Sequence, residues 1–318
     1  MDIPKVNERW TSQINEVTIG ATADQGGTRS KVITVGGQTT LPGMTFEGDI
    51  PNSPVIAGYV SDVVPEWPDF LKKAIGNEIN SPTEWAQKCV QEFGCDLISL
   101  RLNGADPSGD DKSAADCAKV VENVLKAVDV PLIIWGCGDD DKDAIVLQDC
   151  SAVVKGENCL IGSAKESNYK TIVAICKADN HKIISEAPVD INIGKQVNIL
   201  LQDAGYDLKD VVMFQTTAAL GYGLDYVYTI LERARMTGLK GDKLMAGPQL
   251  ADVGGEVWRI KDAVASEEIL PGWGDPERRG PSWEAACAAD YLQAGADILV
   301  MSHPSAIKTI QETITQIA

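Results

Sequence analysis

Gln293-Ala-Gly-Ala-Asp-Ile-Leu-Val-Met301 ends a helix-like segment at a glycine and opens an apolar run at the aspartate two residues later. The same pattern occurs in Gln91-Glu-Phe-Gly-Cys-Asp-Leu-Ile-Ser-Leu100 and in Gln202-Asp-Ala-Gly-Tyr-Asp-Leu208. Glycine is favoured where a helix ends in left-handed backbone, and a short apolar run is typical of a buried strand. The repeat therefore predicts helices that alternate with buried strands, as in a parallel sheet covered on both faces.

Eight apolar runs of strand length follow this alternation. They lie at residues 55–59, 97–102, 132–136, 159–163, 182–185, 211–215, 244–247 and 298–302. Ser81 and Ser113 stand where N-caps of the intervening helices are expected. An open doubly wound sheet shows the same alternation, but eight evenly spaced units favour closure. We predict an α/β fold, a (β/α)8 TIM barrel.

Two regions exceed the barrel pattern. Residues 1–53 hold two short β-like runs, Val17-Thr-Ile-Gly20 and Lys31-Val-Ile-Thr-Val35, on either side of a glycine turn. We predict a β-hairpin in this N-terminal extension and assign residues 54–318 to the barrel. The second region is an insertion at residues 252–282. We predict a short helix at 256–264 in it, followed by a loop rich in proline and glycine at 271–281.

The net charge of the chain is −18, from 28 basic and 46 acidic residues. So acidic a surface repels phosphate backbones and anionic lipids, which argues against nucleic-acid and membrane partners. There is no apolar run of membrane-spanning length and no apolar signal core at the N-terminus. These features predict a cytoplasmic protein.

The eight cysteines include no Cys-x-x-Cys pair, and most fall in apolar helix or strand patterns. We expect reduced, structural thiols and no iron–sulfur cluster in this chain. The two histidines are far apart in sequence: His303 follows the last strand, and His181 is expected on the surface at the opposite end of the barrel. No metal site, catalytic residue or phosphate-binding loop is predicted.

Polar side chains follow the predicted strands, where barrel enzymes place their functional residues. The predicted ligand-binding residues are Asn103, Asp139, Glu166, Glu186, Gln215, Thr216, Gln249 and His303. Amides and carboxylates without a lysine nucleophile or a metal set suit a ligand rich in hydrogen-bonding groups. The alternative is an ordinary polar rim, in which Asp139 only caps the following helix.

The loop at 271–283 contains Trp273, Arg278 and Arg279, which are residue types enriched in the hot spots of protein interfaces. We therefore predict that it contacts a partner. The alternative is that Trp283 is a core residue of the next helix and that the arginines pair with Asp275 and Glu277.

Several longer segments carry a resemblance to a known family. They are Asp96-Leu-Ile-Ser-Leu-Arg-Leu-Asn-Gly-Ala-Asp-Pro107, Trp135-Gly-Cys-Gly-Asp-Asp-Asp-Lys-Asp143, Asp190-Ile-Asn-Ile-Gly-Lys-Gln-Val-Asn198, Gln215-Thr-Thr-Ala-Ala-Leu-Gly-Tyr-Gly223 and Trp273-Gly-Asp-Pro-Glu-Arg-Arg-Gly-Pro-Ser-Trp283. The chain resembles the small subunit of the corrinoid iron–sulfur protein. That family includes the delta subunit of the CO dehydrogenase/acetyl-CoA synthase, or acetyl-CoA decarbonylase/synthase, complex.

The resemblance implies a barrel subunit, not itself catalytic, that forms a heterodimer with a large corrinoid iron–sulfur subunit. The cobalamin then belongs to the large subunit and lies at the interface, not ligated by this chain. A methyltransferase brings the methyl group from methyltetrahydrofolate or a methanogen pterin, and acetyl-CoA synthase receives it. This is the Wood-Ljungdahl (acetyl-CoA) pathway of carbon fixation in anaerobes.

Two other functions fit a barrel with this mouth. A corrinoid methyltransferase that binds its pterin there would use Asn103 and Asp139, the residue types by which related barrels hold that ligand. An aldolase would need a Schiff-base lysine at a strand end, and Lys165 is the lysine so placed.

Overall fold

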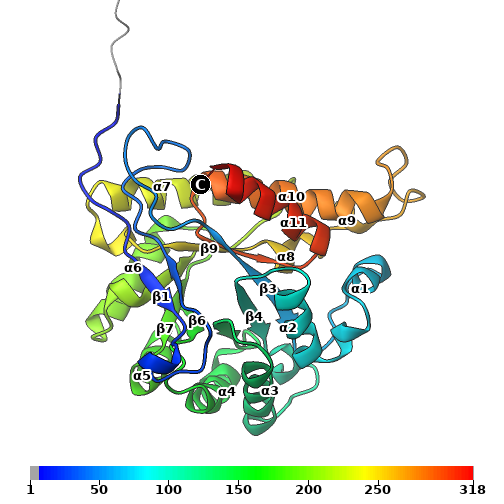
Figure 1. Cartoon of the computed structure of the whole chain (residues 1–318), viewed down its shortest axis with the longest axis horizontal. Helices are drawn as coiled ribbons and strands as arrows, with labels where there is room; N and C mark the ends of the chain where they lie inside the picture. The colour runs from blue at the N-terminus through cyan, green and yellow to red at the C-terminus, as the bar shows by residue number, and fades with distance from the viewer. Residues whose placement is uncertain (1–6, 318) are drawn as a thin grey trace, which may run out of the picture.

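The structure, a computed structural model, describes residues 7–317, so residues 1–6 of the predicted N-terminal extension lie outside the described residues. Eight parallel strands close into a barrel surrounded by helices (Figure 1). Around the barrel the strands follow chain order, and the last, β10, pairs with both β9 and the first, β3. The predicted TIM barrel is confirmed.

The strands of the barrel are β3 (Val55–Ser61), β4 (Leu97–Arg101), β5 (Leu132–Trp135), β6 (Leu160–Ala164), β7 (Lys182–Glu186), β8 (Val211–Phe214), β9 (Gln249–Asp252) and β10 (Ile298–Met301). The helices are α1 (Asp69–Ile75), α2 (Pro82–Gln91), α3 (Ala114–Ala127), α4 (Asp140–Val153), α5 (Tyr169–Asp179), α6 (Ile191–Asp203), α7 (Leu224–Leu239), α8 (Val253–Val257), α9 (Lys261–Val264), α10 (Pro276–Ala294) and α11 (Pro304–Ile317). None of the helices within residues 7–317 is both long and apolar enough to cross a membrane.

The helix boundaries follow the local signals of the sequence. Ser81 and Ser113 accept hydrogen bonds from backbone N–H groups three residues on, as N-caps do. At the other end, the repeated glycines Gly94, Gly205 and Gly295 have φ angles of 68°, 76° and 102°. A residue with a Cβ atom is strained in this left-handed region, so glycine fixes the turn from each helix toward its strand.

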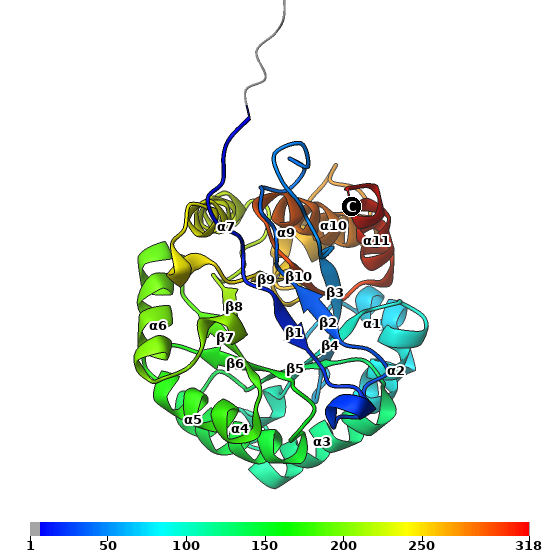
Figure 2. The ribbon, with the colours of Figure 1, turned by 60° about the vertical axis from the view of Figure 1, so that its left-hand side comes forward.

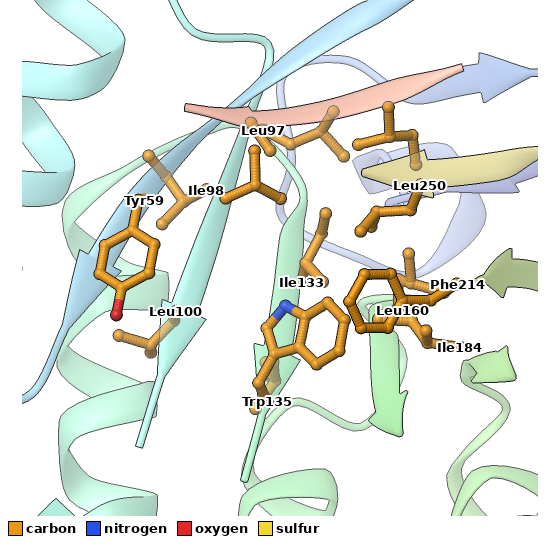
Figure 3. Packing of buried hydrophobic residues seen from close by; sticks show 14 of the residues in the cluster. Tyr59, Leu97, Ile98, Leu100, Ile133, Trp135, Leu160, Ile184, Phe214 and Leu250 are labelled. Carbon is orange, nitrogen blue, oxygen red and sulfur yellow. The ribbon is translucent and has the colours of Figure 1, made fainter. Parts of the chain in front are cut away.

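The barrel interior is a packed apolar core. Figure 3 shows Trp135 and Phe214 side by side among aliphatic side chains of neighbouring strands, including Ile133, Leu160 and Leu250. The two aromatic rings meet edge to face, with centroids 5.3 Å apart. Because side chains fill the centre, the barrel has no axial channel, and chemistry is confined to its ends.

The strand predicted at residues 244–247 is wrong. Residues Lys243–Met245 form a 3₁₀ turn capped by Asp242, and the strand is Gln249–Asp252, which pairs with β8 and β10. The polar Gln249 concealed this strand. Its side-chain amide is buried and donates to the carbonyl oxygens of Leu231, at 3.0 Å, and Gly295, at 3.4 Å.

The predicted N-terminal hairpin is confirmed: β1 (Val17–Ile19) pairs antiparallel with β2 (Ile33–Val35). Figure 2 shows this small sheet lying across one end of the barrel. Its contacts are with segments that precede strands, because Gly20 N donates to Asn158 O and Asn158 Nδ2 donates to Thr18 O. The hairpin therefore covers the amino-terminal end, and the end formed by the loops after the strands stays open.

His181 is a correction to the sequence prediction, because it is buried at the covered end rather than exposed. Its Nδ1 accepts a hydrogen bond from Cys159 N, and its Nε2 lies 3.2 Å from Ser151 O. Acceptance at Nδ1 requires the neutral ring with its proton on Nε2. Burial accordingly lowers the pKa of His181.

Arg29 fastens the hairpin to the barrel. Its buried guanidinium forms an ion pair with Glu157 at 3.0 Å and donates to the carbonyl oxygens of Leu125, Val128 and Val130. Glu157 also accepts from Thr28 N and Oγ1. The pair thus joins the extension to segments that precede β5 and β6.

Arg29→Met should lower the free energy of unfolding by about 3–5 kcal/mol, because it leaves the Glu157 carboxylate buried without its cation. The matched control is Lys31→Met, which removes an exposed ion pair to Asp96 and should cost at most about 1 kcal/mol. Urea denaturation of both variants measures the difference. Equal losses would show that the buried pair does not anchor the extension.

Candidate functional site

The open end of the barrel holds a cavity of about 240 Å³. Every strand except β10 contributes a lining residue from its carboxyl end or the loop that follows it, and the short helix α8 covers one side. The lining residues are Tyr59, Arg101, Asn103, Trp135, Gly136, Cys137, Gly138, Asp143, Gly162, Ser163, Lys165, Glu186, Phe214, Thr216, Asp252, Gly255, Glu256 and Arg259. We call this cavity the mouth.

The floor of the mouth is an arginine held between a ring and a carboxylate. The guanidinium carbon of Arg101 lies 3.8 Å from the centre of the Trp135 ring, and Nη2 donates to Asp252 Oδ2 at 2.5 Å. Asp252 also caps α8 by accepting from Gly255 N. A stacked, ion-paired arginine is a rigid group, so the floor is fixed by three strands, β4, β5 and β9.

Three of the predicted ligand-binding residues line the mouth: Asn103, Glu186 and Thr216. Asn103 Nδ2 donates to the hydroxyl oxygens of Tyr59, at 3.3 Å, and Ser61, at 3.1 Å. Glu186 accepts a hydrogen bond from Ser163 Oγ. Thr216 donates to Ala187 O, which holds the start of the loop after β8 over the loop after β7.

Asp139, Glu166 and His303 do not line the mouth. Asp139 is exposed and accepts from Lys142 N, so it is the N-cap of α4, as the alternative interpretation held. Glu166 is exposed on the outer rim. His303 is buried beside the mouth, where its ring stacks on Trp258 and its Nδ1 accepts from Ser305 N.

Gln215 and Gln249 are placed away from the mouth, which corrects their predicted position. The buried amide of Gln215 points outward to α6, where a Cβ atom at Gly194 would lie 2.8 Å from its Oε1. Gln249 is the first residue of β9, at the covered end. Both errors come from the assumption that a polar residue after an apolar run faces the barrel axis.

The sequence reasoning missed Arg101, Asp143 and Asp252 as mouth residues. Asp143 accepts from Cys137 N at 2.8 Å and Gly138 N at 3.0 Å, and burial raises its pKa. Arg101 ends β4 within one of the segments that carry the family resemblance, so its position in the strand was the available signal. Asp252 was hidden by the misplaced strand.

A buried carboxylate, Glu284 of α10, supports the rim next to His303. It accepts from Trp258 Nε1 and from the backbone N–H groups of Ser302 and His303. Burial raises the pKa of Glu284 to about 7 despite these three donors. Its role is to hold the segment after β10 against α10.

The segment at 271–283 differs from the predicted loop, because α10 already begins at Pro276. Arg278 and Arg279 are therefore helical. Arg279 donates to the carbonyl oxygens of Asp262, Ala265 and Gly274, so it holds the preceding segment together. Arg278 is exposed and has no ion pair within residues 7–317.

Trp273 is half exposed and stacks on Trp283, with ring centroids 6.1 Å apart and planes inclined by 17°. Trp283 Nε1 donates to Leu220 O in the loop after β8. Leu220 and Tyr222 of that loop are also exposed. We call Leu220, Tyr222, Trp273 and Arg278 the rim patch.

All eight cysteines are free thiols, and Cys137 alone among them is not buried. Cys137 lines the mouth and donates from Sγ to Asp143. Burial raises its pKa to about 12, so at neutral pH it is a thiol rather than a thiolate nucleophile. Within the described part of the chain, no three His, Cys, Asp or Glu residues gather as metal ligands.

Residues 16–315 match the profile of a family described as CO dehydrogenase/acetyl-CoA synthase delta subunit. The chain is similar to the acetyl-CoA decarbonylase/synthase complex subunit delta of Archaeoglobus fulgidus, with 38% identity across 96% of this chain and 68% of the relative. The subunit delta of Methanocaldococcus jannaschii is 35% identical across 98% of this chain and 77% of the relative.

Solved structures of similar shape include dihydropteroate synthases. One from Xanthomonas albilineans with 4-aminobenzoic acid has a TM-score of 0.55 and 16% identity over 87% of this chain and 98% of its own. Another from Thermus thermophilus has a TM-score of 0.55 and 15% identity over 84% of this chain and 95% of its own. At this identity the likeness concerns the barrel fold.

The stability of the protein should fall in acid partly through His303, whose pKa burial lowers to about 4. Between pH 6.5 and about pH 4 the His303 ring is protonated in the unfolded chain and neutral in the folded protein. Its contribution to the free energy of unfolding is therefore complete above pH 6.5 and is lost as the pH falls through about 4. His303→Asn keeps an acceptor for Ser305 N but does not titrate. Between pH 7 and 4 the variant should lose about 2–3 kcal/mol less unfolding free energy than the wild type.

Urea denaturation at several pH values measures this difference. His181, whose pKa is also lowered, is present in both proteins and cancels in the comparison. Parallel stability curves would show that His303 does not contribute.

Proposed function

The chain belongs to the family of CO dehydrogenase/acetyl-CoA synthase delta subunits, and from this premise we propose that it is the barrel subunit of a heterodimeric corrinoid iron–sulfur methyl carrier. Its large partner holds an iron–sulfur cluster and a cobalamin. In this proposal a methyltransferase delivers the methyl group from methyltetrahydrofolate or a methanogen pterin, and acetyl-CoA synthase receives it. The complex works in the cytoplasm of an anaerobe.

The observation that carries this proposal is the mouth itself. A rigid floor of Arg101, Trp135 and Phe214 closes it below, and its walls present hydroxyl, amide and carboxylate groups. The lining contains no thiolate and no free amine, since Cys137 is protonated and Lys165 pairs with Asp140 at 3.3 Å. Such a surface suits shielding and orientation of a reactive group better than covalent catalysis.

The mouth suits contact with one face of a cobalamin, and it is too small to enclose the whole cofactor. A cavity of about 240 Å³ is too small to take in a corrin macrocycle, so the corrin would lie against the rim. Asn103, Glu186 and Tyr59 are the mouth residues suited to hydrogen-bond its side-chain amides. Neither histidine is placed to bind cobalt, because His181 is buried at the covered end and His303 Nδ1 is engaged by Ser305.

When bound by the partner, cobalamin supplies a cobalt centre that accepts and donates the methyl group. The residues of this chain would exclude water and oxidants from that centre. Preorganised groups do this at little cost, because Arg101 and Asp252 already satisfy each other and do not reorganise when a partner docks. Opening and closing would come from movement of the partner against a fixed barrel.

Neither rival function gains support from the mouth. The pterin-dependent methyltransferase was expected to use Asn103 together with Asp139, but only Asn103 faces the cavity. The aldolase requires Lys165 as a free amine, whereas its ammonium group is paired with Asp140.

We predict that the chain purified alone is colourless, and that co-expression with the large subunit yields a coloured heterodimer. Gel filtration with visible spectroscopy distinguishes the two states. The control is the large subunit expressed alone, which should retain its corrinoid and its cluster. Tight corrinoid absorbance in the isolated chain, or failure of the two subunits to co-elute, would contradict the proposal.

The rim patch is the surface we propose for the partner. Trp273 and Arg278 are exposed, and the segment that carries them follows β9, so it belongs to the end of the barrel that holds the mouth. Aromatic residues and arginine dominate interface hot spots, and Arg278, which has no ion pair within residues 7–317, suits a carboxylate on the partner. Arg279 contributes indirectly, by fixing the backbone that carries Trp273.

Trp273→Ala combined with Arg278→Ala should weaken heterodimer formation by about tenfold or more, a loss of at least about 1.4 kcal/mol. Sedimentation or surface binding with the large subunit measures this change. Arg233→Ala, an exposed arginine on α7, is the matched control and should leave affinity unchanged. Wild-type affinity in the double variant would assign the patch to ordinary surface.

A further inference from the structure

Cys137 lines the mouth, and it is the one of the eight cysteines, all within the described residues, that is not buried. It stands three residues before α4, and a hydrogen bond from the backbone N–H of Asp139 favours its thiolate. A partly exposed cysteine at the N-terminus of a helix is commonly reactive, because N–H groups and the helix dipole stabilise negative sulfur. By position alone, Cys137 is therefore expected to be a nucleophile.

Asp143, in the first turn of α4, opposes this tendency. Cys137 Sγ donates to Asp143 Oδ1 at 3.2 Å, so the thiol proton lies between the sulfur and a carboxylate. A thiolate could not donate this hydrogen bond, and its charge would be repelled by the carboxylate. Burial raises the pKa of Cys137, and the charge of Asp143 adds to the effect, to about 12.

The backbone before α4 is shaped to hold this carboxylate. Asp143 also accepts from Cys137 N at 2.8 Å and from Gly138 N at 3.0 Å. A Cβ atom at Gly136 would lie 2.1 Å from Asp143 Oδ1, and Gly138 has a φ angle of 100°. Both glycines are thus needed for the chain to wrap around the carboxylate. The three donors favour the ionised form of Asp143 and keep it beside the sulfur.

Within residues 7–317, no cation near Cys137 is free to stabilise a thiolate. The other charged side chains near Cys137 and Asp143 are Asp106 in the loop after β4, Lys142 of α4 and Lys165 in the loop after β6. Lys142 pairs with Asp111 at 2.6 Å, and Lys165 pairs with Asp140 at 3.3 Å. Asp106 adds negative charge, so it also disfavours ionisation of the thiol.

A thiolate in the mouth would compete for the methyl group that the proposed function brings there. In that side reaction the thiol gives its proton to water, and a sulfur lone pair forms an S–CH3 bond. The bond between the methyl carbon and its carrier breaks, and its electron pair stays on the carrier. The methyl group would then be lost to the acceptor, and a thioether would remain in the mouth.

We propose that Asp143 is a specificity-determining residue of the mouth, which keeps Cys137 as a neutral thiol so that the carried methyl group is not lost to this chain. Asp143 acts through Cys137 and needs no contact with the methyl group, so it is a positioning residue. This inference rests on the proposed function for the nature of the electrophile. The state of the thiol, in contrast, is a property of this chain alone.

The test measures the rate at which iodoacetamide alkylates Cys137 in the purified chain at pH values from 7 to 10. Mass spectrometry of peptides assigns the label to Cys137, and Cys137→Ser gives the background from the buried cysteines. Because only the thiolate reacts, the wild-type rate should still rise about tenfold per pH unit at pH 10. An ordinary thiol would level off above its pKa of about 8.5.

Asp143→Asn keeps the size of the side chain and one acceptor oxygen but removes the charge. It should move the pH profile to lower pH and speed alkylation at pH 8 by about fivefold or more. Asp141→Asn removes the same charge from an exposed position on α4, and this matched control should react within about twofold of the wild type. Loosening of the loop alone would raise the rate without moving the profile. Thermal melting verifies that each variant is folded.

A wild-type profile that levels off near the ordinary pKa would overturn the inference, and this result needs no variant. A folded Asp143→Asn with the wild-type profile would overturn it as well. In a heterodimer that transfers methyl groups, mass spectrometry should find methylated Cys137 in Asp143→Asn and not in the wild type, and any other outcome contradicts the proposed role.

The two proposals can fail separately. A heterodimer in which Cys137 has an ordinary alkylation profile defeats this inference alone. The expected profile in a chain that forms no heterodimer defeats the proposed function alone.

Discussion

The pairing of β10 with β3 is the constraint on which the rest of the molecule depends. Ile298 to Met301 lie in register with Val55 to Gly58, and the same strand pairs with β9 on its other side. Without this ladder the sheet would be open and would have two unpaired edges. With it, all eight strands end on one rim, and loops far apart in sequence meet around a single mouth. The Arg101 to Asp252 contact, between residues 151 apart in the chain, exists only because the barrel closes.

The closed barrel has two ends, one covered by the hairpin and one open. At the amino-terminal end the hairpin lies over the strands and is held by the buried pair of Arg29 and Glu157. The buried charges of Arg29 and Glu157 are satisfied by each other and by neighbouring protein groups, so this pair contributes to stability. At the other end Glu186 and Tyr59 keep free hydrogen-bonding capacity inside a cavity. Unsatisfied polar groups are costly in a folded protein, and a functional site is where such a cost is retained.

Sequence patterns predicted the barrel because its signals are local. A glycine that must be left-handed, a serine that caps a helix and a run of apolar residues each act within a few positions, as Gly295, Ser81 and Ile298–Met301 illustrate. Gln249 is an exception to the rule that buried strands are apolar runs. Its side-chain amide donates to the carbonyl groups of Leu231 and Gly295, which only the tertiary fold brings near. The strand Gln249–Asp252 was therefore placed too early in the sequence, at 244–247.

The candidate site was predictable only in part, because local signals do not fix the direction of a side chain. Strand ends give the rim, so Asn103, Glu186 and Thr216 were correctly expected to line the mouth, but the direction of a side chain depends on what packs against it. Gln215 turns outward because Gly194 leaves room for its amide, and Arg101 was overlooked because a single arginine at a strand end has no sequence signature.

The rigidity of the floor bears on how a non-catalytic barrel takes part in methyl transfer. Arg101 is stacked, ion-paired and largely buried, so the electrostatic environment above it stays the same whether or not a partner is present. A reactive centre that docks on the mouth then meets fixed dipoles instead of mobile water. The barrel need not rearrange, so the conformational change takes place in the moving partner. Selectivity among ligands is left to the few groups with unused capacity. Within the described residues, Glu186, Tyr59 and Arg101 Nε are mouth groups whose hydrogen-bonding capacity the protein leaves partly unused.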